Sequence, residues 1–408
     1  MKKMTSPFLL AGCLLLGLTA CFSPWAGDET ELRISLGNQG LSRQLVVLDS
    51  NDQPTIPLTY ELILKGPGGT QRFDFNGTSA VVKVVPGNYQ VTVRALGNSD
   101  AVNAGGGPSP FPAGTMILRA FGEQEVMVRG GAAIPVSIDM TSAMEVTNWE
   151  QLGVACSLDA NSTRKEFIFI KNSFSTTVGA AISIDRNITL RAERPVSITA
   201  GAPNECFSVV GPNGTLTLEG PLTLAGGPGI THTSAAVQIA GGTFTMTGGS
   251  ITGFTFFVPL GVNAAPAVYV ASGTFNMSGG SITGNTKTDN GNSNAGGVYV
   301  SAGGTFNMSG GIITGNNFSN IGSGAGGVYV AGTFNMSGGI ITGNSRTNTN
   351  PGGVLVYGGT LNIVSPATPD ASGSIRGNIS PNSPSNVFNY TGTVRVNGVP
   401  LLPPESSW

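Results

Sequence analysis

The most regular feature of the sequence is a unit of three short apolar segments, separated by glycines, that recurs in the C-terminal half. In a typical unit the segments read VYV, TFNM and IT, and apolar and polar residues alternate within them. Alternation with a period of two predicts β-strands buried on one side, and stacked repeats predict a solenoid in which successive coils share one core. The regular copies fill residues 235–378 and begin at Ala235, Pro266, Gly296, Gly326 and, in a degenerate form, Gly352.

Equivalent side chains of successive coils are expected to lie above one another, because neighbouring strands are about 4.8 Å apart. The alternation predicts an interior stack formed by Phe244, Phe275, Phe306 and Phe334. The methionines of the same segment, the isoleucines of the third segment and the paired valines of the first should form further inner columns. Burying each phenylalanine or isoleucine contributes about 1.5–3 kcal/mol, so these columns should dominate the stability of the array.

An asparagine ends the third segment of successive coils, at Asn285, Asn316, Asn344 and Asn378. Stacked side-chain amides can hydrogen-bond along a column, so these residues predict a structural ladder parallel to the solenoid axis. Asparagine also tolerates a left-handed turn conformation, and the two roles are compatible. Polar stretches of varied length follow the column and are expected to form loops on one side of the solenoid, which is often the binding side.

Two further elements precede the repeats. Residues 31–142 contain short alternating segments separated by turn residues, which predict a β-sandwich. Thr147 and Glu150 fit a capping box, with Thr147 as N-cap. The short helix that follows is expected to cover the open end of the solenoid, with a plain linker helix as the alternative. The predicted fold is therefore all-β: a β-sandwich, a cap helix, a parallel β-helix over residues 145–400 and a tail over residues 401–408.

The N-terminus has the pattern of a targeting segment. Lys2 and Lys3 precede an apolar run of 11 residues, which is too short to span a bilayer but fits a signal peptide. The sequence LTAC, ending at Cys21, resembles the bacterial lipobox. That resemblance implies a signal peptide over residues 1–20, acylation of Cys21 by palmitate-like chains, a linker over residues 21–30 and attachment to the lipid bilayer. Cys13 ends a weaker match, and an ordinary cleaved signal or an uncleaved anchor is the alternative.

The residue after the lipobox cysteine bears on the location. In lipoproteins an aspartate at this position is associated with retention in the inner membrane, whereas here the residue is Phe22. The resemblance therefore implies an outer-membrane or cell-surface location, and a periplasm-facing orientation stays open.

The amino-acid composition argues against several classes of function. The chain has 20 Lys+Arg and 22 Asp+Glu residues, a formal net charge of −2, so it lacks the basic surface that nucleic-acid binding requires. A single histidine and the absence of any CxxC motif predict no metal site, and nothing indicates a cofactor. Cys156 and Cys206 either form a disulfide or are two separate buried thiols.

Two segments resemble known families. The helix, the irregular early coils and the YV, TFNMSGG and ITGN units together resemble the pectin-lyase-like right-handed parallel β-helix of bacterial surface proteins and adhesins. The segment PGNYQVTV resembles a strand of bacterial Ig-like and prealbumin-like modules. These resemblances imply a right-handed solenoid preceded by a spacer module.

The charged residues do not favour catalysis. Between Pro221 and Pro404 the only acidic residues are Asp289 and Asp370, whereas hydrolysis of a glycosidic bond requires paired carboxylates. No two charged residues are expected to recur at one position of the repeat. The predicted function is therefore structural or adhesive and non-enzymatic.

Binding of a glycan or a surface-protein partner would use the polar faces and loops of the solenoid. Tyr269, Tyr299 and Tyr329 are candidate glycan contacts, unless they only shield the sheet surface. The alternative function is a polysaccharide lyase or glycoside hydrolase that acts through charged residues of the early coils, such as Glu166, Asp185 and Arg186.

Overall fold

The computed structural model describes most of the chain as an all-β protein, with 64% strand and 3% helix. The described residues are 29–40, 57–99, 110–158, 164–176, 181–201, 206–257, 266–288, 294–319, 323–347, 351–364, 374–376, 378–379, 386–402 and 406–407. The predicted signal peptide and the lipidation site Cys21 lie outside these residues. The chain forms two compact units, one built mainly from residues 58–96 and 121–140 and the other mainly from residue 141 onward.

The N-terminal unit contains antiparallel strand pairs. Its strands are β1 (Thr30–Gly40), β2 (Thr59–Gly66), β3 (Gly69–Phe75), β4 (Ser79–Val84), β5 (Gly87–Asn98), β6 (Met116–Val128) and β7 (Ile134–Val146). Strand β2 pairs with β3 and β5, and β1 pairs with β4, all antiparallel. Alternate side chains such as Leu32, Leu62 and Val91 are fully buried. The period-two pattern read from the sequence therefore does separate an inner from an outer side in these strands.

A short helix, α3 (Trp149–Ser157), follows β7. The predicted N-cap is wrong by one residue: the cap is Asn148, whose side-chain oxygen accepts a hydrogen bond from the Gln151 backbone N–H at 2.9 Å. The Gln151 side-chain oxygen in turn accepts from the Thr147 backbone N–H at 2.8 Å. Trp149 packs against Phe207 with ring centroids 5.7 Å apart, so the apolar side of the helix faces the core of the early coils.

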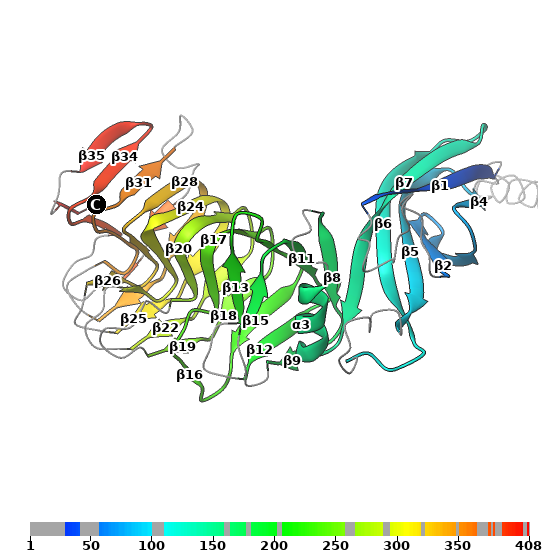
Figure 1. The fold of residues 1–408 in the computed structure, drawn as a ribbon. Coiled ribbons are helices and arrows are strands. Elements are labelled where there is room, and N and C mark those ends of the chain that lie inside the picture. The colour runs from blue at the N-terminus through cyan, green and yellow to red at the C-terminus, as the bar shows by residue number, and fades with distance from the viewer. Residues whose placement is uncertain are drawn as a thin grey trace, which may run out of the picture. The chain divides into compact units, whose positions relative to one another are not determined.

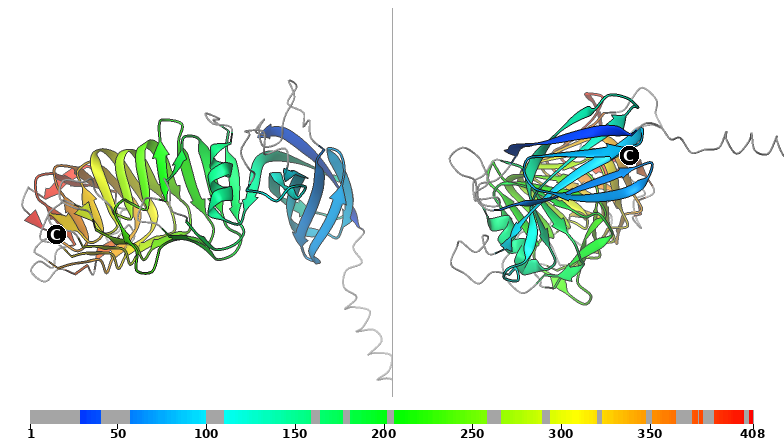
Figure 2. Two further views of the ribbon diagram at one scale, coloured as in Figure 1. Left: turned by 60° about the horizontal axis from the view of Figure 1, so that its bottom comes forward. Right: turned by 90° about the vertical axis from the view of Figure 1, so that its right-hand side faces the viewer.

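The C-terminal unit is a right-handed-type parallel β-solenoid of about six turns. Its coils are stacked side by side along the solenoid (Figure 1; left view of Figure 2). Each of its three long parallel faces is named here after residues that it turns inward. The Val face contains β10 (Ile182–Ile184), β13 (Phe207–Val210), the first parts of β17 (Val237–Met246), β20 (Val268–Met277) and β24 (Val298–Thr314), β27 (Val328–Val330), β30 (Val354–Val356) and β33 (Val387–Asn389). The Phe face contains β8 (Glu166–Ile170), β11 (Asn187–Arg191), β14 (Thr215–Glu219), later parts of β17, β20 and β24, the first part of β28 (Thr333–Thr342), β31 (Thr360–Ile363) and β34 (Thr393–Val396). The Ile face contains β9 (Phe174–Ser175), β12 (Val196–Ala200), β15 (Leu222–Gly226), β18 (Ser250–Thr252), β21 (Ser281–Thr283), the ends of β24 and β28, and β32 (Ser374–Arg376).

The sequence predicts three strands in each coil, but the structure contains a fourth parallel ladder. It consists of the two-residue strands β16 (Thr231–His232), β19 (Thr255–Phe256), β22 (Thr286–Lys287), β25 (Asn317–Phe318) and β29 (Ser345–Arg346). A smaller pair, β23 (Asn294–Ala295) and β26 (Gly324–Ala325), lies in the stretches that the sequence assigns to loops.

The interior columns have the composition that the repeat predicts. Phe244, Phe275, Phe306 and Phe334 are each fully buried, and neighbouring rings in this column are 5.1, 4.7 and 4.6 Å apart. The equivalent methionines, isoleucines and valines are buried beside them. At the corner between the Phe and Ile faces, Gly311 has a φ of 80°, and a Cβ there would meet the Gly279 carbonyl oxygen at 2.9 Å. The glycines of the SGG motif therefore allow the sharp bend between faces.

At its C-terminal end the chain reverses direction. Strand β35 (Val399–Leu402) pairs antiparallel with β34, and β36 (Ser406–Ser407) pairs antiparallel with β33. Residues assigned to a polar tail thus add antiparallel strands beside the last parallel ones. An open sheet edge invites pairing with another chain, and these strands cover two such edges.

Candidate functional site

The outer side of the Phe face carries a regular set of uncharged polar side chains. On four successive coils this face presents a hydroxyl, then a hydroxyl or amide, and then a hydroxyl that directly follows the last in-register residue of the ladder; we call this set the Thr–Asn–Ser array. Its members are Thr243, Thr245, Thr247, Thr274, Asn276, Ser278, Thr305, Asn307, Ser309, Thr333, Asn335 and Ser337. The first two positions of each strand are partly exposed and the third is exposed, so the array presents one donor–acceptor pattern repeated at the strand spacing.

The amides of the array form a ladder of their own. Asn307 Nδ2 donates to Asn276 Oδ1 at 2.9 Å, and Asn335 Nδ2 donates to Asn307 Oδ1 at 2.9 Å. Asn362 Nδ2 extends the chain by donating to Asn335 Oδ1 at 2.8 Å. Each amide has two N–H donors and two acceptor positions, so the ladder leaves capacity on every amide for solvent or a ligand. The alternation that turns Phe275 and Met277 inward places the asparagine between them on the outer side, but it does not reveal that successive asparagines are hydrogen-bonded.

The predicted asparagine ladder is buried. Asn285 Nδ2 donates to Asn316 Oδ1 at 3.0 Å, Asn316 Nδ2 donates to Asn344 Oδ1 at 2.9 Å, and Asn344 Nδ2 donates to Asn378 Oδ1 at 3.0 Å. The second N–H of each amide donates to a carbonyl oxygen of the adjoining coil, such as Ile282 O for Asn316. These amides are occupied with structural bonds, so the ladder supports the loops and is not a surface for ligands.

The three candidate glycan-contact tyrosines lie in one column of the Val face. Tyr269 and Tyr299 stack with ring centroids 5.3 Å apart, and Tyr299 meets Tyr329 edge to face at 4.9 Å. Burial raises the pKa of Tyr299 above its ordinary value. Tyr329 is only 2% exposed and packs with Ala295 and Ala325. The assignment of Tyr329 as a glycan contact is therefore wrong, because the segments containing β23 and β26 cover its ring.

A second correction concerns the charged residues. Lys287 and Arg346 do recur at one position of the repeat, in the fourth ladder, where the register runs from His232 through Phe256, Lys287 and Phe318 to Arg346. All five side chains are at most 2% exposed. The Arg346 guanidinium lies 4.9 Å from the Phe318 ring centroid, and burial lowers the pKa of Arg346 to about 10.

The contact of Arg346 with Phe318 stabilises this end of the column through cation–π attraction. The signal in the sequence was the position two residues after the ladder asparagine, which holds Lys287, Phe318 and Arg346 in successive coils. The column lies inside the solenoid, so it does not supply an exposed charged site.

Several charged residues of the early coils, on which an enzyme would depend, form ion pairs. Glu166 and Arg186 are buried with their nearest side-chain atoms 3.3 Å apart. Arg186 also donates to the carbonyl oxygen of Ala155 in α3 at 2.6 Å, where a cation is favoured by the C-terminal end of a helix. The Nζ atom of Lys171 lies 2.9 Å from Oε1 of Glu145. Within the described ranges no group of three or more His, Cys, Asp or Glu side chains is placed to hold a metal ion.

Cys156 and Cys206 are both buried thiols, and the disulfide that the sequence left open is not formed. Burial raises the pKa of Cys156 to about 12, with Arg186 lowering it and Glu166 raising it. Since the thiolate is the reactive form of cysteine, burial and a raised pKa both disfavour a reactive Cys156, and its side chain packs in the interior.

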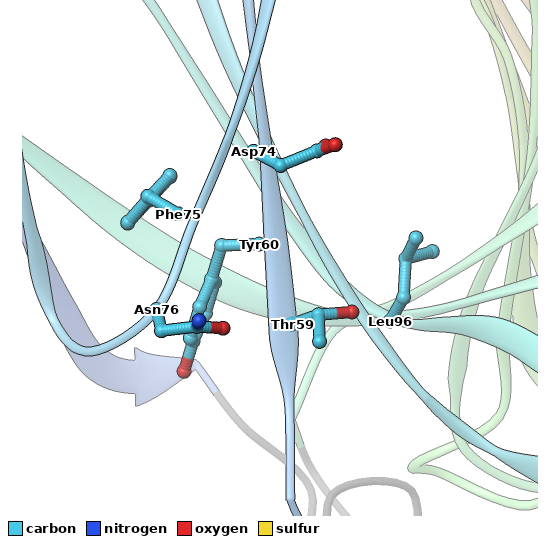
Figure 3. A pocket seen from close by; sticks show the side chains of 6 residues that line it. All are labelled: Thr59, Tyr60, Asp74, Phe75, Asn76 and Leu96. Atoms are coloured by element: carbon cyan, nitrogen blue, oxygen red, sulfur yellow. The ribbon is translucent and has the colours of Figure 1, made fainter.

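The N-terminal unit contains an open hollow of about 400 Å³, lined by Thr59, Tyr60, Asp74, Phe75, Asn76 and Leu96. The rings of Tyr60 and Phe75 stack with centroids 5.3 Å apart. Figure 3 shows Asp74 and Leu96 on one side of β2 and Tyr60 and Asn76 on the other. The polar groups therefore do not converge on one point, and the hollow lacks the arrangement of a small-molecule site.

Comparisons with known proteins add nothing to what the fold and the side chains show. No family model, no curated protein and no solved structure matches this chain. In the part of the chain that the structure describes, no helix is long and apolar enough to cross a membrane.

Proposed function

We propose that this protein is a lipid-anchored, non-enzymatic protein of the cell envelope or cell surface, with a structural or adhesive role. The observation that carries the binding part of the proposal is the Thr–Asn–Ser array, which offers hydroxyls and amides to a neutral polar ligand on four successive strands. A glycan or the polar surface of a partner protein has matching donors and acceptors.

The remaining parts of the proposal assign a task to each segment. Acylated Cys21 holds the chain to an outer membrane, and an Ig-like β-sandwich acts as a spacer. Helix α3 caps a pectin-lyase-like right-handed β-helix, which presents the array and the loops. The antiparallel strands of the N-terminal unit, the burial of Trp149 against Phe207 and the parallel coils support the assignments of the sandwich, the helix and the solenoid. The assignments of Cys21 and of the membrane depend on the lipobox resemblance alone.

The array is tested with two variants of the full chain in strand β24. Ser309 is exposed within the array, and Ile312 is 40% exposed on the Ile face. Binding of the wild type to a glycan microarray should identify a neutral glycan. Ser309→Arg is expected to weaken the affinity for that glycan about tenfold or more, corresponding to about 1.4 kcal/mol, because a charged side chain would occupy the array.

Ile312→Arg is the matched control, because it adds the same side chain to the same strand on another face. Equal weakening by both variants would exclude the array as the binding surface. Absence of any glycan or cell-surface binding would leave the structural role alone, and release of unsaturated products from polygalacturonate would overturn the non-enzymatic proposal.

The lipid anchor is tested separately. In a bacterial host fed a labelled fatty acid, the wild-type chain should carry the label, and Cys21→Ala should lose it because the acyl-bearing thiol is absent. Cys13→Ala should keep the label, since Cys13 ends the weaker lipobox match. Retention of label by Cys21→Ala would show that Cys21 is not the lipidated residue.

A further inference from the structure

Two tyrosines near the C-terminal end of the solenoid form an exposed parallel pair. The rings of Tyr357 and Tyr390 have centroids 5.0 Å apart and planes at 6° to each other. Tyr357 is 38% exposed and Tyr390 is 41% exposed. Both phenols are therefore accessible to a reagent in solution while they lie against each other.

The backbone holds this pair in place. Val356 and Asn389, the residues that precede the two tyrosines, are partners in the parallel ladder of β30 and β33. The Tyr390 N–H donates to the Val356 carbonyl oxygen at 2.8 Å, and the Tyr357 N–H donates to the Val330 carbonyl oxygen at 2.8 Å. The ring contact thus follows from the stacking of the coils, and it persists as long as the last parallel strands are paired.

The other tyrosine contacts of the solenoid differ in exposure or geometry. Tyr269 and Tyr299 are partly buried and their planes are 25° apart, whereas Tyr299 and Tyr329 are nearly perpendicular at 89°. Tyr329 also contacts Tyr357, with centroids 6.0 Å apart, but it is almost completely buried. Among the contacts of this row, only Tyr357–Tyr390 combines parallel rings with two exposed phenols.

We propose that Tyr357 and Tyr390 are a site of oxidative coupling, at which a peroxide oxidant activated by a haem peroxidase joins the two rings. Each phenol loses one electron and its O–H proton to give a phenoxyl radical. The two radicals form one carbon–carbon bond between ring positions next to the phenolic oxygens, and the two displaced ring hydrogens return as protons to the oxygens. The two electrons and two protons removed reduce one hydrogen peroxide to two waters, so the reaction balances.

The product would be a covalent staple between the last two coils that carry tyrosines. A cross-link stabilises a folded chain mainly by restricting its unfolded state, and terminal elements are where unfolding tends to begin. Cys156 in helix α3 and Cys206, which directly precedes β13, do not form a disulfide. The tyrosine pair would therefore strengthen the solenoid at its C-terminal end under oxidising conditions.

The test uses the full chain treated with hydrogen peroxide and horseradish peroxidase at low protein concentration. Dityrosine fluorescence should appear in the monomer, with loss of two hydrogen atoms from the intact mass. Proteolysis followed by mass spectrometry should give one peptide pair joined through Tyr357 and Tyr390. The treated protein should also resist thermal unfolding of its C-terminal coils better than the untreated protein.

Tyr357→Phe keeps the ring stack but removes one phenol, so it should fold normally by circular dichroism and lose the intramolecular product. Tyr269→Phe is the matched control and should retain the product. A product that joins other tyrosines, that forms only between molecules or that survives in Tyr357→Phe would overturn the proposal. So would the absence of any coupling in the folded wild type.

Discussion

Replacing Phe306 with aspartate should unfold the solenoid. The Phe306 ring is fully buried between Phe275 and Phe334, with centroids 4.7 and 4.6 Å away. Truncating a buried phenylalanine typically costs about 3–5 kcal/mol, and aspartate would add an unpaired charge in an apolar interior. Domains are stable by only about 5–15 kcal/mol. We therefore expect the variant to be unfolded at room temperature already, so that it shows no cooperative melting transition on heating.

The matched control is Ser309→Asp. It places the same charge three residues further along β24, on the exposed outer side, where substitutions usually change stability by no more than about 0.5 kcal/mol. Thermal melting followed by circular dichroism compares the two variants. If Phe306→Asp melted like the wild type, the inward register of the Phe face would be wrong.

The second large effect is expected from Asn316→Leu. The Asn316 side chain donates to Asn344 Oδ1 and Ile282 O and accepts from both the backbone N–H and Nδ2 of Asn285. Leucine has a similar size but makes none of these bonds, and each buried polar group left unsatisfied costs about 1–3 kcal/mol. We expect the free energy of unfolding to fall by about 3–6 kcal/mol, measured by urea denaturation.

Asn307→Leu is the control, because Asn307 belongs to the outer ladder and is partly exposed. Water can replace its lost hydrogen bonds, so its free energy of unfolding should fall by only about 1 kcal/mol. Similar losses in the two variants would mean that burial does not distinguish the inner ladder from the outer one.

The two asparagine ladders differ in direction as well as in burial. In the inner ladder each Nδ2 donates to the coil that follows, as from Asn285 to Asn316, whereas in the outer ladder it donates to the coil that precedes, as from Asn307 to Asn276. The inner amides also bond to backbone carbonyls, which completes their hydrogen bonding. The outer amides keep unused capacity, and for this reason the outer ladder, not the inner one, is part of the proposed binding surface.

The N-cap of helix α3 is not determined by the neighbouring residues alone. Thr147 and Asn148 are both good N-cap residues, and sequence spacing favoured Thr147 because Glu150 follows three residues later. The structure uses Asn148 because Gln151 is held by tertiary contacts, with its Nε2 donating to the Pro110 carbonyl oxygen at 3.0 Å. A choice between adjacent cap residues was therefore decided by a segment distant in the sequence.

The sequence alone determined the repeat, the strand alternation and the inner columns of phenylalanine and asparagine. It could do so because each coil stacks on a near copy of itself, so the same residue meets the same neighbours in every coil. Only the tertiary structure decided which side chains the inserted segments cover. Lys287 and Arg346 are buried in the fourth ladder, and Tyr329 is buried beneath the segments that contain β23 and β26. The inserts between repeats vary in length and sequence, so they carry no periodic signal from which this burial could be predicted. The state of Cys156 and Cys206 and the pairing of Tyr357 with Tyr390 depend likewise on distances between coils, which composition and spacing do not specify.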